Sequence, residues 1–254
     1  MATAVAVGAS ADIRPASAHG TLVGHNEING QNTYLFNRTT NVMGTSPYTF
    51  QYNSTFYSRL EAWEGAYYSL TPGHWIRPTN LGISDIHRDT LKPSGSLSMH
   101  AYGRAMDIER IYMTDSNTGS TFLAANLRGN QLSTATDWKR YWAAVASLNY
   151  YFDYVLHWHS GDHTDHVHAD NEINGSADSN FRTGSQTQVT FLQASLNRIW
   201  GKSLAVDGSY GPLTRDAAAD AVRRLGLSGY ITTQNNWLTY CRGTTMFGTG
   251  RATF

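Results

Sequence analysis

The apolar side chains along this chain alternate between the spacings typical of strands and of helices. Aromatic side chains two apart over residues 48–52 predict a strand with one buried face. Apolar side chains three and four apart predict one helix over residues 56–70 and another, capped by Asp137, over residues 137–147. A short helix is also predicted over residues 121–127. Elements of both kinds therefore follow one another along the first part of the chain.

Three segments near the middle of the chain have the pattern of strands. Residues 105–111 are predicted as one strand, and residues 150–158 and 164–169 as two more. Gly161 and Asp162 mark a turn between the last two strands, which makes them a hairpin. Together with the helices, these segments predict an α+β fold whose sheet is antiparallel.

The chain changes character after residue 180. Residues 181–188 contain mainly small and polar residues, and we interpret them as a linker. Beyond it, apolar residues at helical spacing begin at Val189, and a further helix is predicted over residues 213–225. We therefore expect two domains, a larger one over residues 19–180 and a small three-helix domain over residues 189–254.

Composition and charge favour a secreted protein. Only 15% of the 254 residues are charged, and Lys plus Arg equal Asp plus Glu at 19 each, so the charge pattern of a nucleic-acid-binding protein is missing. No apolar run is long enough to span a membrane. The Ala-rich residues 1–18 resemble the remnant of a secretory signal peptide, with a disordered lead as the alternative. The single cysteine, Cys241, excludes an intrachain disulfide, and we expect a monomer.

Two stretches carry the chemistry of a metal site. The first, residues 98–107, offers His100 and Asp107 seven residues apart, and the second, residues 163–168, offers three imidazoles. Catalytic zinc takes three protein ligands of these types and keeps a position for water. His166 and His168 lie two apart in a predicted strand and can face one site together, so that one binds the metal while the other transfers protons. Small residues at 103 and 105 allow close backbone packing between the two ligands.

These motifs resemble the LAS superfamily of zinc peptidases, which has a hedgehog-like fold. Within it, His-x-Asp-His-x-His is similar to the penicillin-insensitive murein endopeptidases and extensin-like domains, while the Glu-x-x-His of D-alanyl-D-alanine carboxypeptidase members is absent. The resemblance implies one zinc ion per chain, bound by His100, Asp107 and His168. It also implies that His166 is the catalytic base and that His163 is a further active-site histidine.

Other residues are candidates for orienting the ligands or binding the substrate. Ser98 precedes the first motif and can orient His100 or cap the loop. Tyr102 lies inside that motif and can line the pocket or pack, and Asp165 directly precedes His166. Arg77 and Arg88 are candidates for binding a substrate carboxylate, because the guanidinium group offers two parallel donors. A solvated surface role is the alternative for both arginines.

The C-terminal segment carries a second resemblance. Leu192-Gln193, the loop over residues 206–214 and the Ala-rich residues 217–221 are similar to the small three-helix peptidoglycan-binding module of bacterial proteins. This resemblance covers residues 186–228. Together, the two resemblances imply a secreted zinc peptidase that hydrolyses peptide bonds, involving D-amino acids, in cell-wall peptidoglycan. The alternative is a non-catalytic wall-binding protein whose metal site is structural or degenerate.

Overall fold

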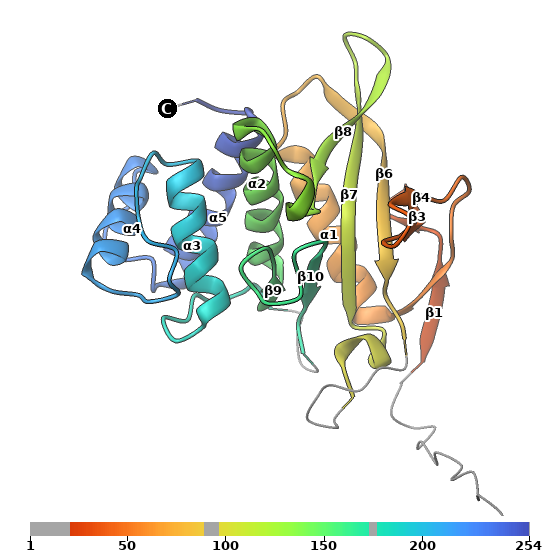
Figure 1. Cartoon of the computed structure of the whole chain (residues 1–254), viewed down its shortest axis with the longest axis horizontal. Helices are drawn as coiled ribbons and strands as arrows, with labels where there is room; N and C mark the ends of the chain where they lie inside the picture. The colour runs from red at the N-terminus through yellow and green to blue at the C-terminus, as the bar shows by residue number, and fades with distance from the viewer. Residues whose placement is uncertain (1–20, 89–96, 173–176, 254) are drawn as a thin grey trace, which may run out of the picture.

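The computed structural model describes residues 21–88, 97–172 and 177–253 (Figure 1). The predicted lead over residues 1–18 lies outside these residues. A twisted sheet lies beside the helices α1 and α2, and three further helices, α3 to α5, lie beyond α2 on the side away from most of the sheet (Figure 1). Helices and strands are thus mixed, and the sheet is mostly antiparallel, as an α+β fold requires.

The large sheet has eight strands in the order β2-β3-β6-β7-β10-β9, with β4 paired to β3 and β8 paired to β7. Every pair is antiparallel except β3 and β6. A second, two-stranded sheet joins β1 to β5. The strands are β1 (Leu22–His25), β2 (Glu27–Ile28), β3 (Gln31–Asn37), β4 (Val42–Met43), β5 (Phe50–Asn53), β6 (Trp75–Asp85), β7 (Ala105–Asp115), β8 (Ser120–Asn126), β9 (Tyr154–Leu156) and β10 (Val167–Asp170).

Strand β7 is the element that organises the sheet. Its early residues pair with β10 and its later residues pair with β8 on the same side, while β6 covers the other side. The predicted strands over residues 105–111 and 164–169 correspond to β7 and β10. Strand β10 also pairs with β9, so the predicted histidine-rich hairpin is present.

The two helices beside the sheet begin at side-chain caps. Helix α1 (Ser54–Ser69) begins after Asn53, whose side chain accepts hydrogen bonds from two backbone N–H groups of the first turn. Helix α2 (Ala135–Tyr151) begins after Thr134, which forms a capping box with Asp137. Asp137 is therefore the third residue of the helix and not its cap. The helix also continues to Tyr151, which leaves β9 shorter than the predicted strand over residues 150–158.

The predicted helix over residues 121–127 is wrong, because this segment forms strand β8. A short apolar run such as Phe122 to Ala125 fits a strand and a helix equally well by spacing alone. Pairing with β7 decides the conformation, and the ring of Phe122 packs edge-on against Trp75 of β6 at 5.0 Å. Tertiary contacts have therefore overruled the local pattern.

The three C-terminal helices are α3 (Gln186–Arg198), α4 (Pro212–Arg224) and α5 (Gln234–Thr249). Helix α5 packs closely along α2, where a side chain at Gly248 would come within 2.7 Å of the Ala143 side chain. The hydroxyl group of Thr245 donates a hydrogen bond to the Ala143 carbonyl at 3.2 Å. The buried apolar side chains of the sheet, α1 and α2 are continuous with those of α3 to α5.

The connection between the two predicted domains is packed against the protein. The Phe181 ring is buried and lies 5.0 Å from the Trp237 ring of α5. Residues 186–188 already belong to α3, whose cap is Ser185. The division into two domains stays a prediction, but its linker is not a loose tether. In the described part of the chain, none of the helices combines the length and hydrophobicity needed to cross a bilayer.

Candidate metal centre

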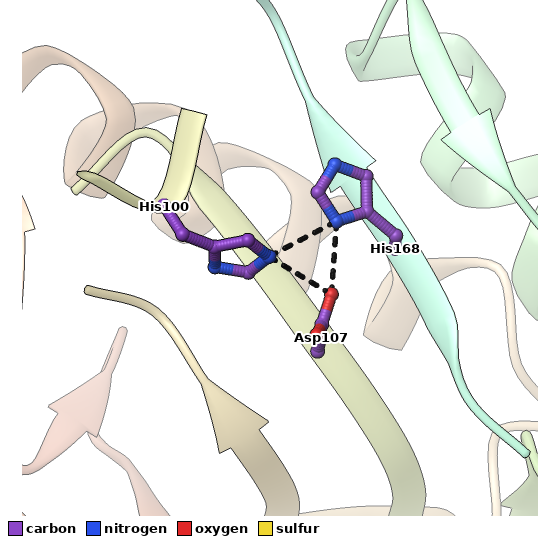
Figure 2. Close-up of side chains that lie close together, drawn as sticks. All are labelled: His100, Asp107 and His168. Carbon is purple, nitrogen blue, oxygen red and sulfur yellow. Dashed lines mark hydrogen bonds and ion pairs between the residues drawn. The ribbon is translucent and has the colours of Figure 1, made fainter. Parts of the chain in front are cut away.

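Three elements bring the predicted ligands together at one end of the sheet (Figure 2). His100 lies in the 3₁₀ turn η1 (Met99–Tyr102), Asp107 in β7 and His168 in β10. The antiparallel register places His168 directly opposite Asp107, so their side chains leave the same face of the sheet. All three residues are buried, with 4 to 8% of their surfaces exposed.

The turn after His100 depends on a glycine. Gly103 has a φ of +62°, in the left-handed region that glycine adopts without strain. A side chain there would lie 2.7 Å from the Leu22 side chain of β1 and 2.9 Å from the Asn53 backbone nitrogen. The Asn53 N–H donates a hydrogen bond to the Gly103 carbonyl at 2.9 Å. The turn that presents His100 is therefore fixed against the two-stranded sheet β1–β5.

The three side-chain atoms that face one another are spaced closely enough to share one metal ion. His100 Nε2 and Asp107 Oδ1 are 3.2 Å apart, His168 Nδ1 and Asp107 Oδ1 are 2.9 Å apart, and the two nitrogens are 3.2 Å apart. Tetrahedral zinc with bonds of about 2.0–2.1 Å places its ligand atoms roughly 3.3 Å from one another. These residues therefore form a group that fits a metal ion.

The opposite ring nitrogens of the two histidines are held by acceptors. His100 Nδ1 lies 3.2 Å from the Ile86 carbonyl oxygen, and His168 Nε2 lies 2.8 Å from Asp170 Oδ2. Each acceptor requires a proton on the nitrogen that it faces. Once a metal ion replaces any proton on His100 Nε2 and His168 Nδ1, their lone pairs would point toward it beside Asp107, which is the tautomer pattern of metal-binding histidines with an outer partner.

Charge at the centre favours a bound cation. Burial lowers the pKa of His168, but hydrogen bonds to Asp107 and Asp170 outweigh it and raise the pKa to about 10. Burial also opposes ionisation of Asp107, yet hydrogen bonds to His100 and His168 hold its pKa well below the ordinary value. The cluster therefore contains buried negative charge that attracts a cation at this position, whether a proton or a metal ion.

His166 lies beside the three ligands but is held by a different partner. Its Nδ1 is 2.8 Å from Asp165 Oδ1, whereas its Nε2 is 3.7 Å from Asp107 Oδ2. Burial lowers its pKa to about 4 and outweighs the negative charge of Asp107, which raises it, while the positive charge of Arg38 adds a smaller lowering effect. The imidazole is therefore neutral at neutral pH, and a proton on Nδ1 toward Asp165 would leave the lone pair of Nε2 facing the centre.

His163 completes a group of three imidazoles on this side of the centre. Its ring centroid lies 4.8 Å from that of His166 and 5.9 Å from that of His168. Its Nδ1 is 2.8 Å from the Ser160 carbonyl oxygen, and burial lowers its pKa. The structure thus places His163 next to His166, where the sequence motif suggested a further active-site histidine.

Arg38 belongs to the site, although the sequence did not indicate it. Its guanidinium lies 2.5 Å from Asp107 Oδ2 and 3.0 Å from Glu109 Oε1, and it donates a hydrogen bond to Ser84 Oγ at 2.8 Å. Asp107 therefore uses one carboxylate oxygen toward the histidines and the other toward Arg38. Arg38 follows β3 directly and comes from a part of the chain without any recognised motif, so only the folded sheet reveals this contact.

The remaining candidates occupy different surroundings. Arg77 lies 2.6 Å from Glu64 and stacks over the Tyr68 ring, so its partners belong to α1 and not to the metal centre. Arg88 pairs with Asp85 at 3.0 Å, and its backbone N–H donates to the His100 carbonyl, so it borders the centre.

The other two candidates flank the turn of His100. Ser98 directly precedes η1, and its buried hydroxyl group has no hydrogen-bond partner among the described residues. The hydroxyl therefore does not orient the His100 ring. Tyr102 is half-buried at the end of η1.

No protein-family model, curated protein or solved structure matched this chain in the comparisons. Interpretation of the metal centre therefore depends on the geometry and charges described above.

Proposed function

We propose that this chain is a zinc-dependent peptidase that hydrolyses peptide bonds in bacterial peptidoglycan. One observation carries the proposal. Three ligand atoms lie 2.9–3.2 Å apart, and a neutral imidazole that belongs to none of them adjoins them. A closed structural zinc site uses four protein ligands, whereas a catalytic site uses three and keeps one position for water.

Zinc bound by His100, Asp107 and His168 would supply an activated water molecule and polarise the scissile carbonyl group. The protein's own residues would do the rest. His166 would accept a proton at Nε2 and return it to the leaving amine. Asp165 would hold His166 in the required tautomer through the 2.8 Å contact at Nδ1. His163 would contact the substrate or assist the proton transfer from beside His166.

Arg38 would keep the carboxylate of Asp107 correctly oriented. Its contact with Oδ2 leaves Oδ1 as the atom that faces His100 and His168. Asp107 would therefore bind zinc through one oxygen. Arg88, exposed at the border of the centre, remains a candidate for binding a substrate carboxylate, while Arg77 is committed to Glu64.

Peptidoglycan as the substrate is supported by the C-terminal loop. Gln193 of α3 is buried, and its amide group donates hydrogen bonds to Asp207, Ser209 and Thr214 and accepts two from backbone N–H groups of the loop. We call these side chains and the loop over residues 206–214 the Gln193 cluster. This cluster uses the residues on which the resemblance to a peptidoglycan-binding module depends. A module of this kind would place a secreted protein at the cell wall.

The test separates metal binding from catalysis. His168→Ala should lose both zinc and hydrolysis of a soluble muropeptide. His166→Ala should retain about one zinc per chain but lose activity by roughly 100-fold or more, the usual contribution of a positioned acid–base group. His74→Ala, which changes an exposed histidine, is the matched control.

Two outcomes would decide against the proposal. If His166→Ala releases zinc and His168→Ala retains it, then His166 is the metal ligand and His168 the catalytic base, contrary to the proposal. A zinc-loaded protein that binds cell walls and releases no peptide from them would favour the non-catalytic wall-binding protein, with a structural or degenerate metal site.

A further inference from the structure

A second concave surface lies away from the ligand atoms, where α2 and α3 meet the turn between β9 and β10. It is a groove of about 380 Å³, within the range of small-molecule sites, which is roughly 300–1,000 Å³. Three tryptophans line it: Trp138 and Trp142 of α2, and Trp158 of the turn. Trp138 and Trp158 are only partly buried, so the groove exposes aromatic surface.

The aromatic rings in this groove are arranged in a row. The Trp138 and Trp142 rings are inclined by 20° with centroids 6.3 Å apart, and the Trp142 and His159 rings by 9° with centroids 5.7 Å apart. Trp158 meets Trp138 edge-on at 5.7 Å. Trp142 itself is buried, so the surface open to a ligand belongs to Trp138, Trp158 and His159. Flat, weakly polar rings of this kind pack well against the C–H faces of sugar rings, whose edges carry the polar groups.

The polar groups of the groove are mainly donors. Arg198 of α3 lies over the Trp138 ring at 5.7 Å and has no carboxylate partner among the described residues. The Lys202 ammonium is held at 2.6 Å by Asp220 of α4. No carboxylate belongs to the lining. A ligand with many oxygen acceptors and no positive charge fits this arrangement, as do the hydroxyl and acetamido groups of an amino sugar.

One turn connects the groove to the metal centre. Trp158 packs over Gly129, where a side chain would lie 2.5 Å from the indole ring, and its backbone N–H donates to the Tyr141 hydroxyl group at 2.8 Å. The same turn continues to His163, whose ring lies against His166 at 4.8 Å. A polymer held in the groove would therefore contact the same turn that carries His163.

We propose that this groove binds the glycan strand of peptidoglycan through its N-acetylated amino sugars, while the metal centre acts on the attached peptide. The inference rests on the proposed function for the identity of the substrate. It assigns glycan binding to a surface built by α2, α3 and the turn between β9 and β10, apart from the Gln193 cluster.

The experiment measures sugar binding without cleavage. A tetramer of β-1,4-linked N-acetylglucosamine, which has no peptide cross-link to cleave, is titrated into the zinc-loaded protein, and binding is followed by tryptophan fluorescence and NMR. Trp138→Ala and Arg198→Gln should each weaken binding by about tenfold, because both remove contacts along the ring row. Arg182→Gln is the matched control, since Arg182 also lies over an aromatic ring, Tyr154, but does not line the groove.

The outcomes distinguish this inference from the proposed function. Absence of tetramer binding by the wild-type protein, or equal binding of all variants, overturns the groove assignment even if zinc-dependent peptide hydrolysis is found. Equal binding of an α-1,4-glucose tetramer overturns the assignment to amino sugars. If the tetramer binds as expected and no peptide is hydrolysed, the groove assignment stands and the peptidase proposal fails. Circular dichroism of Trp138→Ala checks folding, and Arg198→Gln provides the test if that variant unfolds.

Discussion

The metal centre and the Gln193 cluster both bury polar side chains, but they differ in charge. The metal centre gathers Asp107, two histidine ligands and the pair Arg38 and Glu109 within the sheet. The Gln193 cluster is built around one neutral amide, and all of its amide contacts are made within the protein. Burial of ionised groups costs much more free energy than burial of a hydrogen-bonded amide.

The difference shows what each cluster contributes. A neutral amide whose hydrogen bonds are all made within the protein stabilises the fold and requires nothing from outside. A buried charged group whose lone pairs converge on one point remains incomplete until a cation occupies it. Perturbed pKa values accordingly gather at the metal centre, where those of His166 and His168 shift in opposite directions. We therefore expect substitutions in the two clusters to affect different measured quantities.

The largest effect should come from removal of the C-terminal helices. Truncation after Gly184 would expose the face of α2 that packs on α5 and α3, including Trp142 and Ala143. Each large apolar side chain returned to water costs about 1.5–3 kcal/mol, and a typical domain is stable by only about 5–15 kcal/mol. Thermal unfolding followed by circular dichroism should show no cooperative transition for residues 21–184. A native-like transition in that fragment would mean that the two predicted domains fold independently.

Gln193→Ala should mainly affect stability. It leaves the backbone N–H groups of Asp207 and Gly208 without their acceptor, which should lower the free energy of unfolding by about 3 kcal/mol. Urea unfolding measures the change, and zinc content should stay at that of the wild-type protein. Gln186→Ala, at an exposed position of the same helix, is the control. Loss of zinc in Gln193→Ala would show that the two clusters are coupled.

Asp170→Asn should mainly affect metal affinity. The carboxylate of Asp170 holds the proton on His168 Nε2 and so keeps the lone pair of Nδ1 toward Asp107. Loss of such an outer partner typically weakens metal binding by about 10- to 100-fold. Competition with a zinc chelator measures the affinity. The control is Asp178→Asn, which changes the carboxylate that pairs with Arg59. Unchanged affinity would mean that Asp170 does not orient the ligand.

The smallest effect should be a change in acid sensitivity. Burial lowers the pKa of His157 to about 3, so between about pH 6.5 and 3 the unfolded chain binds a proton there that the folded chain does not. This group therefore reduces stability as pH falls below about 6.5. Between pH 7 and 5.5 the wild-type protein should lose about 1 kcal/mol more than His157→Gln, in which an amide can replace the donor to the Thr187 carbonyl.

Urea unfolding at the two pH values measures the difference. His74→Gln, at an exposed position, should behave like the wild-type protein. Equal losses in wild type and His157→Gln would show that His157 is not the acid-sensitive group.

The grouping of His100, Asp107 and His168, which could hold a metal ion, was predictable because its signals are local. His100 and Asp107 belong to one short motif, and the spacing of His166 and His168 is that of a strand. The turn signals at Gly161 and Asp162 were sufficient to predict the hairpin that returns β10 to the sheet. Pairing of β10 with β7 then sets His168 opposite Asp107. The helix predicted over residues 213–225 likewise lies within one residue of α4 at each end.

Other parts of the site depend on contacts that no local pattern encodes. Arg38 meets Asp107 across a separation of 69 residues, and it reaches the centre because β3 pairs in parallel with β6. The aromatic groove joins Trp138 to Arg198 in the same way, through the packing of α2 and α3. The packed connection at Phe181 was missed because a single apolar residue among polar ones resembles a linker until its partner, Trp237, is known.

Fixing the His100 turn against β1 has a consequence for how this protein is produced and modified. A glycine is required at position 103 because Leu22 and the Asn53 backbone leave no room for a side chain, so the strand that begins at Leu22 forms part of the support of a metal ligand 78 positions later. Purification tags or protease sites placed directly next to β1 can therefore disturb the turn that positions His100. An expression design that keeps several residues of spacer before Leu22 leaves this support intact, whereas trimming into β1 removes the Leu22 contact beside the turn of His100.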